Sequence, residues 1–165
     1  MQTKTLDVLF EDTLRDMYFA ERKILRTLPK LARTAQSPDL RAAWKTHGEE
    51  TQLHVERLQQ VFELLGKPAR GKTCPAIDGI IEEGEEVMKA FADSPALDAS
   101  LIAAAQAVEH YEITRYGTLV RWAQVLGRTD LAAILEQTLQ EETMTDETLT
   151  LIADGSVNQA ALQAA

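Results

Sequence analysis

The sequence has little cysteine, few aromatic residues and no long hydrophobic segment. Cys74 is the single cysteine among 165 residues, so no disulfide can form within the chain. Aromatic residues make up only 5% of the chain, and glycine and proline are also scarce, which argues against a sandwich or barrel. No apolar run reaches the length of about 18 residues that indicates a membrane helix, and acidic residues occur too early for a signal or transit peptide. We therefore expect a cytoplasmic protein with no membrane partner.

An excess of basic charge is also absent. The chain has 26 acidic residues against 17 lysines and arginines, which gives a formal net charge of −9. A protein that binds nucleic acid needs a basic surface to displace counterions from phosphates, so we expect no nucleic-acid partner. With 45% hydrophobic residues, a chain of this length can bury one continuous core. The sequence thus predicts a single domain over residues 1–165.

Hydrophobic residues recur at spacings of three and four along nearly the whole chain, which is typical of helices. Ser37 and Pro38 are suited to begin a helix, and Gly127 is suited to end one. Four long helices are predicted over residues 5–34, 38–65, 95–126 and 129–153. A shorter amphipathic segment at 77–91 has two internal glycines, each costing about 1 kcal/mol relative to alanine. We place this segment outside the main bundle.

Two short links and one long middle connection join the four long helices. A long crossover between the second and third helices distinguishes ferritin-like bundles from simple up-and-down bundles. Here the crossover carries the short helix. The sequence therefore predicts an all-α, ferritin-like four-helix bundle with a long crossover that carries an extra short helix.

Each of the four hydrophobic faces is interrupted near its middle by acidic residues or histidine. Residues separated by three or four positions share one face of a helix, so these side chains are expected to point into the bundle at one depth. They are Glu21 in the first helix, Glu50 and His54 in the second, Glu109 and Glu112 in the third, and Glu142 and Asp146 in the fourth.

Six buried carboxylates need a counter-charge. Burying even one unpaired carboxylate costs several kcal/mol, while a whole domain is stable by only about 5–15 kcal/mol. No lysine or arginine lies on these faces at the same depth. Carboxylate oxygens with one imidazole suit iron, with manganese as the alternative, and two divalent ions would leave a residual charge of about −2. The pattern therefore predicts a site for two metal ions.

The spacing of these residues departs from the motif that ferritin-like di-iron proteins use. Those proteins carry Glu-x-x-His on two helices and a single Glu on each of the others. Here the corresponding pairs are Glu50 with His54 and Glu142 with Asp146, each four residues apart. A step of four keeps both members on one face, so a site remains possible. With aspartate in place of a second histidine, it would be more anionic and would favour higher oxidation states.

Other polar residues near these faces have two interpretations. Glu109 is either a ligand, or a residue hydrogen-bonded to a ligand or exposed to solvent. His47 is either a donor to a ligand or a packed polar residue. Tyr18 and Tyr116 could bond to ligand carboxylates, although aromatic packing is the simpler interpretation. His110 is expected at a helix edge or in solvent.

Four segments together resemble one family. EDTLRDMYFAERKIL, THGEETQLHVERLQQVFELLGKPA, AVEHYEITRYGTL and EETMTDETL are similar to YciF-type bacterial stress-response proteins of the ferritin-like superfamily, and the resemblance spans residues 3–153. It implies a two-iron site in a four-helix bundle and a homodimer. The third long helix, with Glu109 and Glu112, also resembles the rubrerythrin helix that supplies two glutamates. The resemblance implies metal ligands at Glu21, Glu50, His54, Glu109, Glu112, Glu142 and Asp146.

Three functions remain open from the sequence. The first is a redox enzyme in which two ferrous ions react with peroxide or O2. The second is a non-catalytic protein that holds iron or uses it structurally. The third is a metal-free helical module that dimerises, which the acidic layer disfavours. No four-cysteine segment follows the fourth helix, so an electron donor would have to be another protein.

Overall fold

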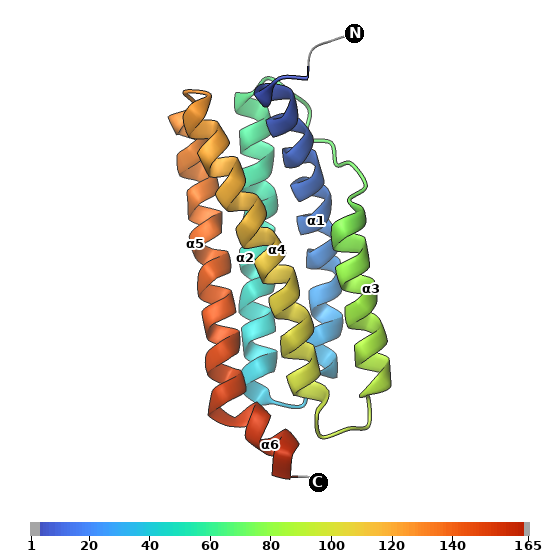
Figure 1. The fold of residues 1–165 in the computed structure, drawn as a ribbon. Helices are drawn as coiled ribbons and strands as arrows, with labels where there is room; N and C mark the ends of the chain where they lie inside the picture. The colour runs from blue at the N-terminus through green and yellow to red at the C-terminus, as the bar shows by residue number, and fades with distance from the viewer. Residues whose placement is uncertain (1–3, 164–165) are drawn as a thin grey trace.

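The fold is a bundle of long helices (Figure 1). The computed structural model describes residues 4–163. In chain order the helices are α1 (Leu6–Thr34), α2 (Pro38–Leu64), α3 (Pro75–Ala90), α4 (Leu97–Val125), α5 (Thr129–Ile152) and α6 (Asn158–Gln163). The predicted all-α bundle is confirmed, and the four long helices lie within a few residues of their expected bounds.

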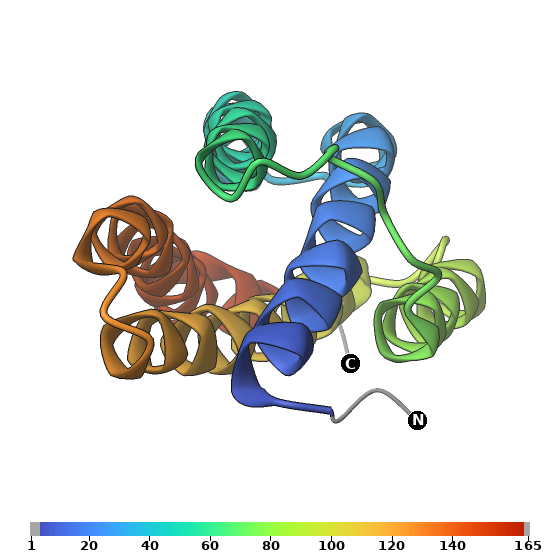
Figure 2. The same cartoon turned by 90° about the horizontal axis from the view of Figure 1, so that it is seen from above.

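The helices α1, α2, α4 and α5 surround the core, and α3 lies outside them. The closest packing is between α4 and α5 and between α1 and α2. In addition, α2 packs against α5, and α1 packs against α4. Seen along the bundle, α3 lies on the side away from α2 and α5 (Figure 2). It packs against α4, and ion pairs from Lys23 to Asp78 and from Lys30 to Glu85 join it to α1. Within residues 4–163, no further helix therefore lies over the face between α2 and α5.

Local sequence signals set the ends of these helices. The Ser37 hydroxyl accepts a hydrogen bond from the Leu40 amide at 3.3 Å, and Pro38 occupies the first turn of α2. At the end of α4, Gly127 has a φ of 72°, and the Arg128 amide donates to the carbonyl of Ala123 at 2.8 Å. That left-handed residue with its backward bond is the Schellman arrangement, which favours glycine.

The C-terminal end stays helical beyond residue 153, where the sequence predicts the last helix to end. Residues Ala153–Val157 form a π-helical turn, and α6 follows it. Val157 is buried against the core beneath α4 and α5. Burial of this side chain favours a continued helical turn over a stop at Gly155. None of the helices in residues 4–163 is both long and apolar enough to cross a membrane.

A polar layer divides the hydrophobic core into two clusters. One cluster includes Phe10, Leu14, Leu58 and Leu135. The other includes Ile24, Leu28, Leu40, Trp44 and Leu101, toward the opposite end of the bundle. Each long helix of the bundle thus contributes apolar residues at both ends and polar residues between them.

Candidate metal centre

The layer between the two apolar clusters is built from acidic residues and histidines that solvent barely reaches. Their exposed fractions lie between 0 and 2%. The residues are Glu21 from α1, His47 and His54 from α2, Glu109 and Glu112 from α4, and Glu142 from α5. Burial of so many ionisable groups is rare unless they are paired or bind a metal.

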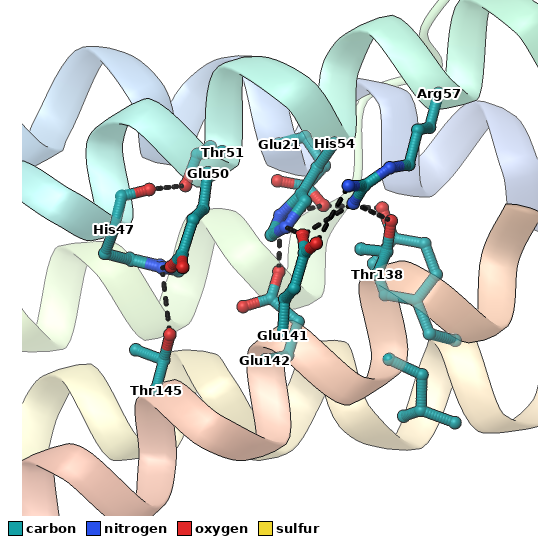
Figure 3. Close-up of polar contacts among 12 residues, drawn as sticks. Glu21, His47, Glu50, Thr51, His54, Arg57, Thr138, Glu141, Glu142 and Thr145 are labelled. Atoms are coloured by element: carbon teal, nitrogen blue, oxygen red, sulfur yellow. Dashed lines mark hydrogen bonds and ion pairs between the residues drawn. The ribbon is translucent and has the colours of Figure 1, made fainter.

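These six residues form two groups that share one carboxylate. Each group has one ligand atom per residue, with all such atoms within 4.8 Å of one another. The first group is Glu21, His54 and Glu142, and the second is His47, Glu109, Glu112 and Glu142. Glu142 lies beside His54 in the close-up of this layer (Figure 3). The two groups of possible ligands are therefore adjacent and meet at Glu142.

Several of the nitrogen and oxygen atoms of this layer that could bind a metal have no hydrogen-bond partner within residues 4–163. Within residues 4–163, no hydrogen bond reaches either carboxylate oxygen of Glu112, nor one oxygen each of Glu21, Glu109 and Glu142, while the other Glu142 oxygen lies 2.9 Å from His54 Nδ1. Such atoms are costly to bury unpaired. Iron and manganese bind carboxylate oxygens and imidazole nitrogens, so the residues of this layer could hold a metal ion of this kind.

When no metal is bound, protons supply part of the positive charge that balances the carboxylates of this layer. Burial lowers the pKa of His54, but Glu21 and Glu142 outweigh burial and raise that pKa to about 11. Burial likewise opposes ionisation of His47, yet Glu109 outweighs it and raises the pKa to about 10. Burial raises the pKa of Glu142 to about 8. The layer therefore holds extra protons that a bound metal would displace.

An ion pair at the edge of the layer orients His54. Burial raises the pKa of Glu141, but bonds from Arg57 and His54 outweigh it and keep that pKa below its usual value. Arg57 holds the carboxylate with two bonds of 2.6 and 2.8 Å. Because an ionised carboxylate only accepts hydrogen bonds, His54 Nε2–H is the donor in its 2.9 Å contact with Glu141. When the ring is neutral, Nδ1 thus presents a lone pair, 2.9 Å from Glu142.

The tyrosines and His110 differ in their relation to the layer. Tyr116 is buried, and its hydroxyl donates a hydrogen bond to Glu21. The sequence left open either packing or a bond to a ligand carboxylate for this tyrosine, and the bond to an acidic residue is present. Tyr18 packs edge-on against Phe62 with ring centroids 5.9 Å apart. His110 is mostly exposed and contacts Asp146, as expected for a helix edge.

Five of the seven predicted ligands come together, and two lie apart. Glu21, His54, Glu109, Glu112 and Glu142 belong to the groups described above. Glu50 and Asp146 belong to neither group. Glu50 is partly exposed, with its Oε2 3.8 Å from His47 Nδ1. Asp146 accepts hydrogen bonds from Gln106 and contacts His110 at the α4–α5 edge.

His47 is the residue that sequence reasoning left undecided. It lies seven positions before His54, which is about two helical turns, so both rings share one face of α2. The ring centroids are 6.4 Å apart. This seven-residue spacing of two histidines, on a face that otherwise meets the core, is the signal that could have identified it.

The fold and this layer define a helical-bundle protein with a buried carboxylate and histidine centre. The chain matches the family described as a domain of unknown function, DUF892, over residues 5–162, and it belongs to that family. It is 43% identical to protein YciF of Escherichia coli (strain K12) over 162 residues, 98% of either chain. The predicted resemblance to YciF-type stress proteins is confirmed.

Solved structures agree with this assignment. The crystal structure of the E. coli stress protein YciF matches with a TM-score of 0.89 and 43% identity, over 94% of this chain and 99% of that one. YcfI from Rhodopseudomonas palustris, for which a structural role has been suggested, matches with a TM-score of 0.87 and 46% identity, over 88% and 93%. A Xanthomonas campestris protein matches at 23% identity with a TM-score of 0.77, which supports the fold alone.

Proposed function

We propose that this protein binds two iron ions in the layer between its core clusters and uses them in a stress response. The observation that carries the proposal is the pair of buried groups that share Glu142. Several carboxylate oxygens of these groups have no hydrogen-bond partner within residues 4–163. Manganese is the alternative metal, because the same donors accept it. The sequence motifs favour Glu50 and Asp146 as further ligands, whereas the geometry favours His47 in addition to the five residues already grouped.

Bound ferrous iron at two adjacent positions would supply two electrons to peroxide or O2. The residues of the chain contribute charge, orientation and protons. Glu21, Glu109, Glu112 and Glu142 would balance the positive charge, and Tyr116 holds a proton on its hydroxyl beside Glu21. Burial, with the negative charge of Glu21 adding to it, raises the pKa of Tyr116, so this proton is retained at neutral pH.

The test is oxidation of the iron-loaded protein. The protein would be loaded anaerobically with Fe(II), counted by elemental analysis, and mixed with H2O2 or O2. We expect two ions per chain and oxidation at least about tenfold faster than that of free Fe(II) in the same buffer. Two ions without faster oxidation would contradict the redox role, and no bound iron would contradict the whole proposal.

A non-catalytic role is the second candidate, favoured by the structural role suggested for the R. palustris relative. In that case iron would hold the four helices together or be passed to a partner. We also propose a homodimer in the cytoplasm, with another protein as electron donor in the redox case. Two exposed apolar side chains of α5, Met144 and Leu151, are seven positions apart and share one face of the helix, which supports contact with a second copy there.

A further inference from the structure

An open pocket lies between α2 and α5, on the face that α3 does not cover. Its volume is about 270 Å3. Its wall is mixed. The polar side chains are Thr46 and Glu50 from α2 and Thr145 and Thr148 from α5, and apolar side chains of both helices complete it: Ala43, Trp44, Met144 and Leu149. His47 also lines it, and because that ring is only 2% exposed, it forms the inner part of the wall. The pocket therefore runs from solvent to a residue of the buried layer.

His47 connects this pocket to the buried carboxylates. Its Nδ1 lies 3.3 Å from the Thr145 hydroxyl and 3.8 Å from Glu50 Oε2 (Figure 3). Its Nε2 lies 3.2 Å from Glu109 Oε1, off the line of a hydrogen bond, and has no other bonding partner within residues 4–163. One nitrogen of the ring thus faces the pocket side, and the other faces the second metal group.

A second pocket also touches His47, but it does not suit a charged ligand. It has a volume of about 30 Å3, about that of one water molecule. Its wall is mostly apolar and includes Ile24, Leu28 and Val108. A divalent cation moves with a shell of bound water that it gives up reluctantly. Such an ion fits the wider pocket between α2 and α5 and not the narrow apolar one.

Glu50 has the position and exposure of a first contact for a cation. Its side chain is 34% exposed, so it meets solvent, whereas the carboxylates of Glu112 and Glu142 are fully buried. A carboxylate near the mouth of a pocket attracts cations and raises their local concentration. The hydroxyl groups of the three threonines can replace part of the hydration shell.

We propose that the pocket between α2 and α5 is the entrance through which divalent cations reach the buried layer, with Glu50 binding them first and His47 next. This inference rests on the proposed metal-binding function. It gives Glu50 a role in the rate of uptake, where the sequence motif predicts a role in the final complex.

The experiment compares Glu50→Gln with Glu49→Gln during rapid mixing of apoprotein with Co(II), whose visible absorption reports binding by imidazole and carboxylate. Glu49 is exposed on the same helix, so its variant matches the charge change outside the pocket. We expect Glu50→Gln to slow binding about tenfold and to reach the wild-type stoichiometry. Glu49→Gln is expected to bind within about twofold of the wild-type rate. Thr148→Leu, which narrows the pocket without removing charge, should also slow uptake.

The possible results separate this inference from the function on which it rests. Wild-type uptake rates in both Glu50→Gln and Thr148→Leu would overturn the entrance. Equal slowing in Glu49→Gln would overturn it too, because overall charge would then explain the effect. Loss of one ion at equilibrium in Glu50→Gln would make Glu50 a ligand and overturn the uptake role. If wild-type protein bound no Co(II) or Fe(II), both the entrance and the metal-binding function would fail.

Discussion

Replacing Glu142 by glutamine is expected to abolish iron binding at both positions. Glu142 is the only residue common to the two groups, so one substitution removes a charged donor from each. Losing a mere hydrogen-bonded neighbour of a ligand costs about 10–100-fold in metal affinity, and losing a shared ligand is expected to cost more. Iron per chain, measured by elemental analysis after anaerobic loading, should fall from two to none.

The same variant is expected to keep its helical structure. The carboxylate of Glu142 is buried, and burial, with the negative charges of Glu21 and Glu109 adding to it, raises its pKa to about 8. A carboxyl group with this pKa is mostly protonated at neutral pH in the metal-free protein, so glutamine replaces it with little change in charge or size. Far-ultraviolet circular dichroism should therefore match that of wild type. Glu147→Gln is the matched control, because Glu147 is exposed on the same helix. Full iron content in Glu142→Gln would contradict the assignment of this residue.

The metal-free protein is expected to lose stability as pH rises from about 5 to about 9. Folding raises the pKa of His47 to about 10 and of His54 to about 11, against about 6.5 in an unfolded chain. Their contribution to stability is complete below pH 6.5 and is lost as pH rises through these higher values. Folding also raises the pKa of Glu142, from about 4.3 in an unfolded chain to about 8. Its contribution to stability is therefore also lost as pH rises, beginning at about pH 4.3. Each extra proton held by the folded state changes the free energy of unfolding by about 1.4 kcal/mol per pH unit.

Urea denaturation with a chelator present, at a series of pH values, measures this dependence. The same series with bound metal should show the metal-dependent stabilisation increasing with pH, because the ligands must lose protons to bind an ion. Stability of the metal-free protein that stayed constant or rose over this range would contradict the account. It would show that the buried layer does not retain protons.

Much of the fold follows from the spacing of hydrophobic residues. The helix predicted at 129–153 is observed at Thr129–Ile152, and Gly127 ends α4 as expected. The continuation through Gly155 was not predictable from local signals, since glycine favours a stop. What keeps that segment helical is the burial of Val157 against residues distant in sequence.

The sequence predicts how far along the bundle the candidate site lies, but it predicts less well which side chains point into the bundle. Acidic residues in the middle of each apolar face indicate a common layer, and Glu21, Glu112 and Glu142 lie in it. On α2, however, His47 and Glu50 are three positions apart on one broad face. Which of them points inward depends on the rotation of the helix about its axis. Packing of Trp44 and Leu58 in the two clusters sets that rotation, and a single helical pattern does not contain it.

The most direct test of the central claim is anomalous X-ray diffraction at the iron edge, from crystals loaded with Fe(II) under anaerobic conditions. The account predicts two peaks about 3.5–4 Å apart on either side of the Glu142 carboxylate. One should lie among Glu21, His54 and Glu142, and the other among His47, Glu109, Glu112 and Glu142. Loaded crystals with no iron peak in this layer would contradict the proposed metal centre.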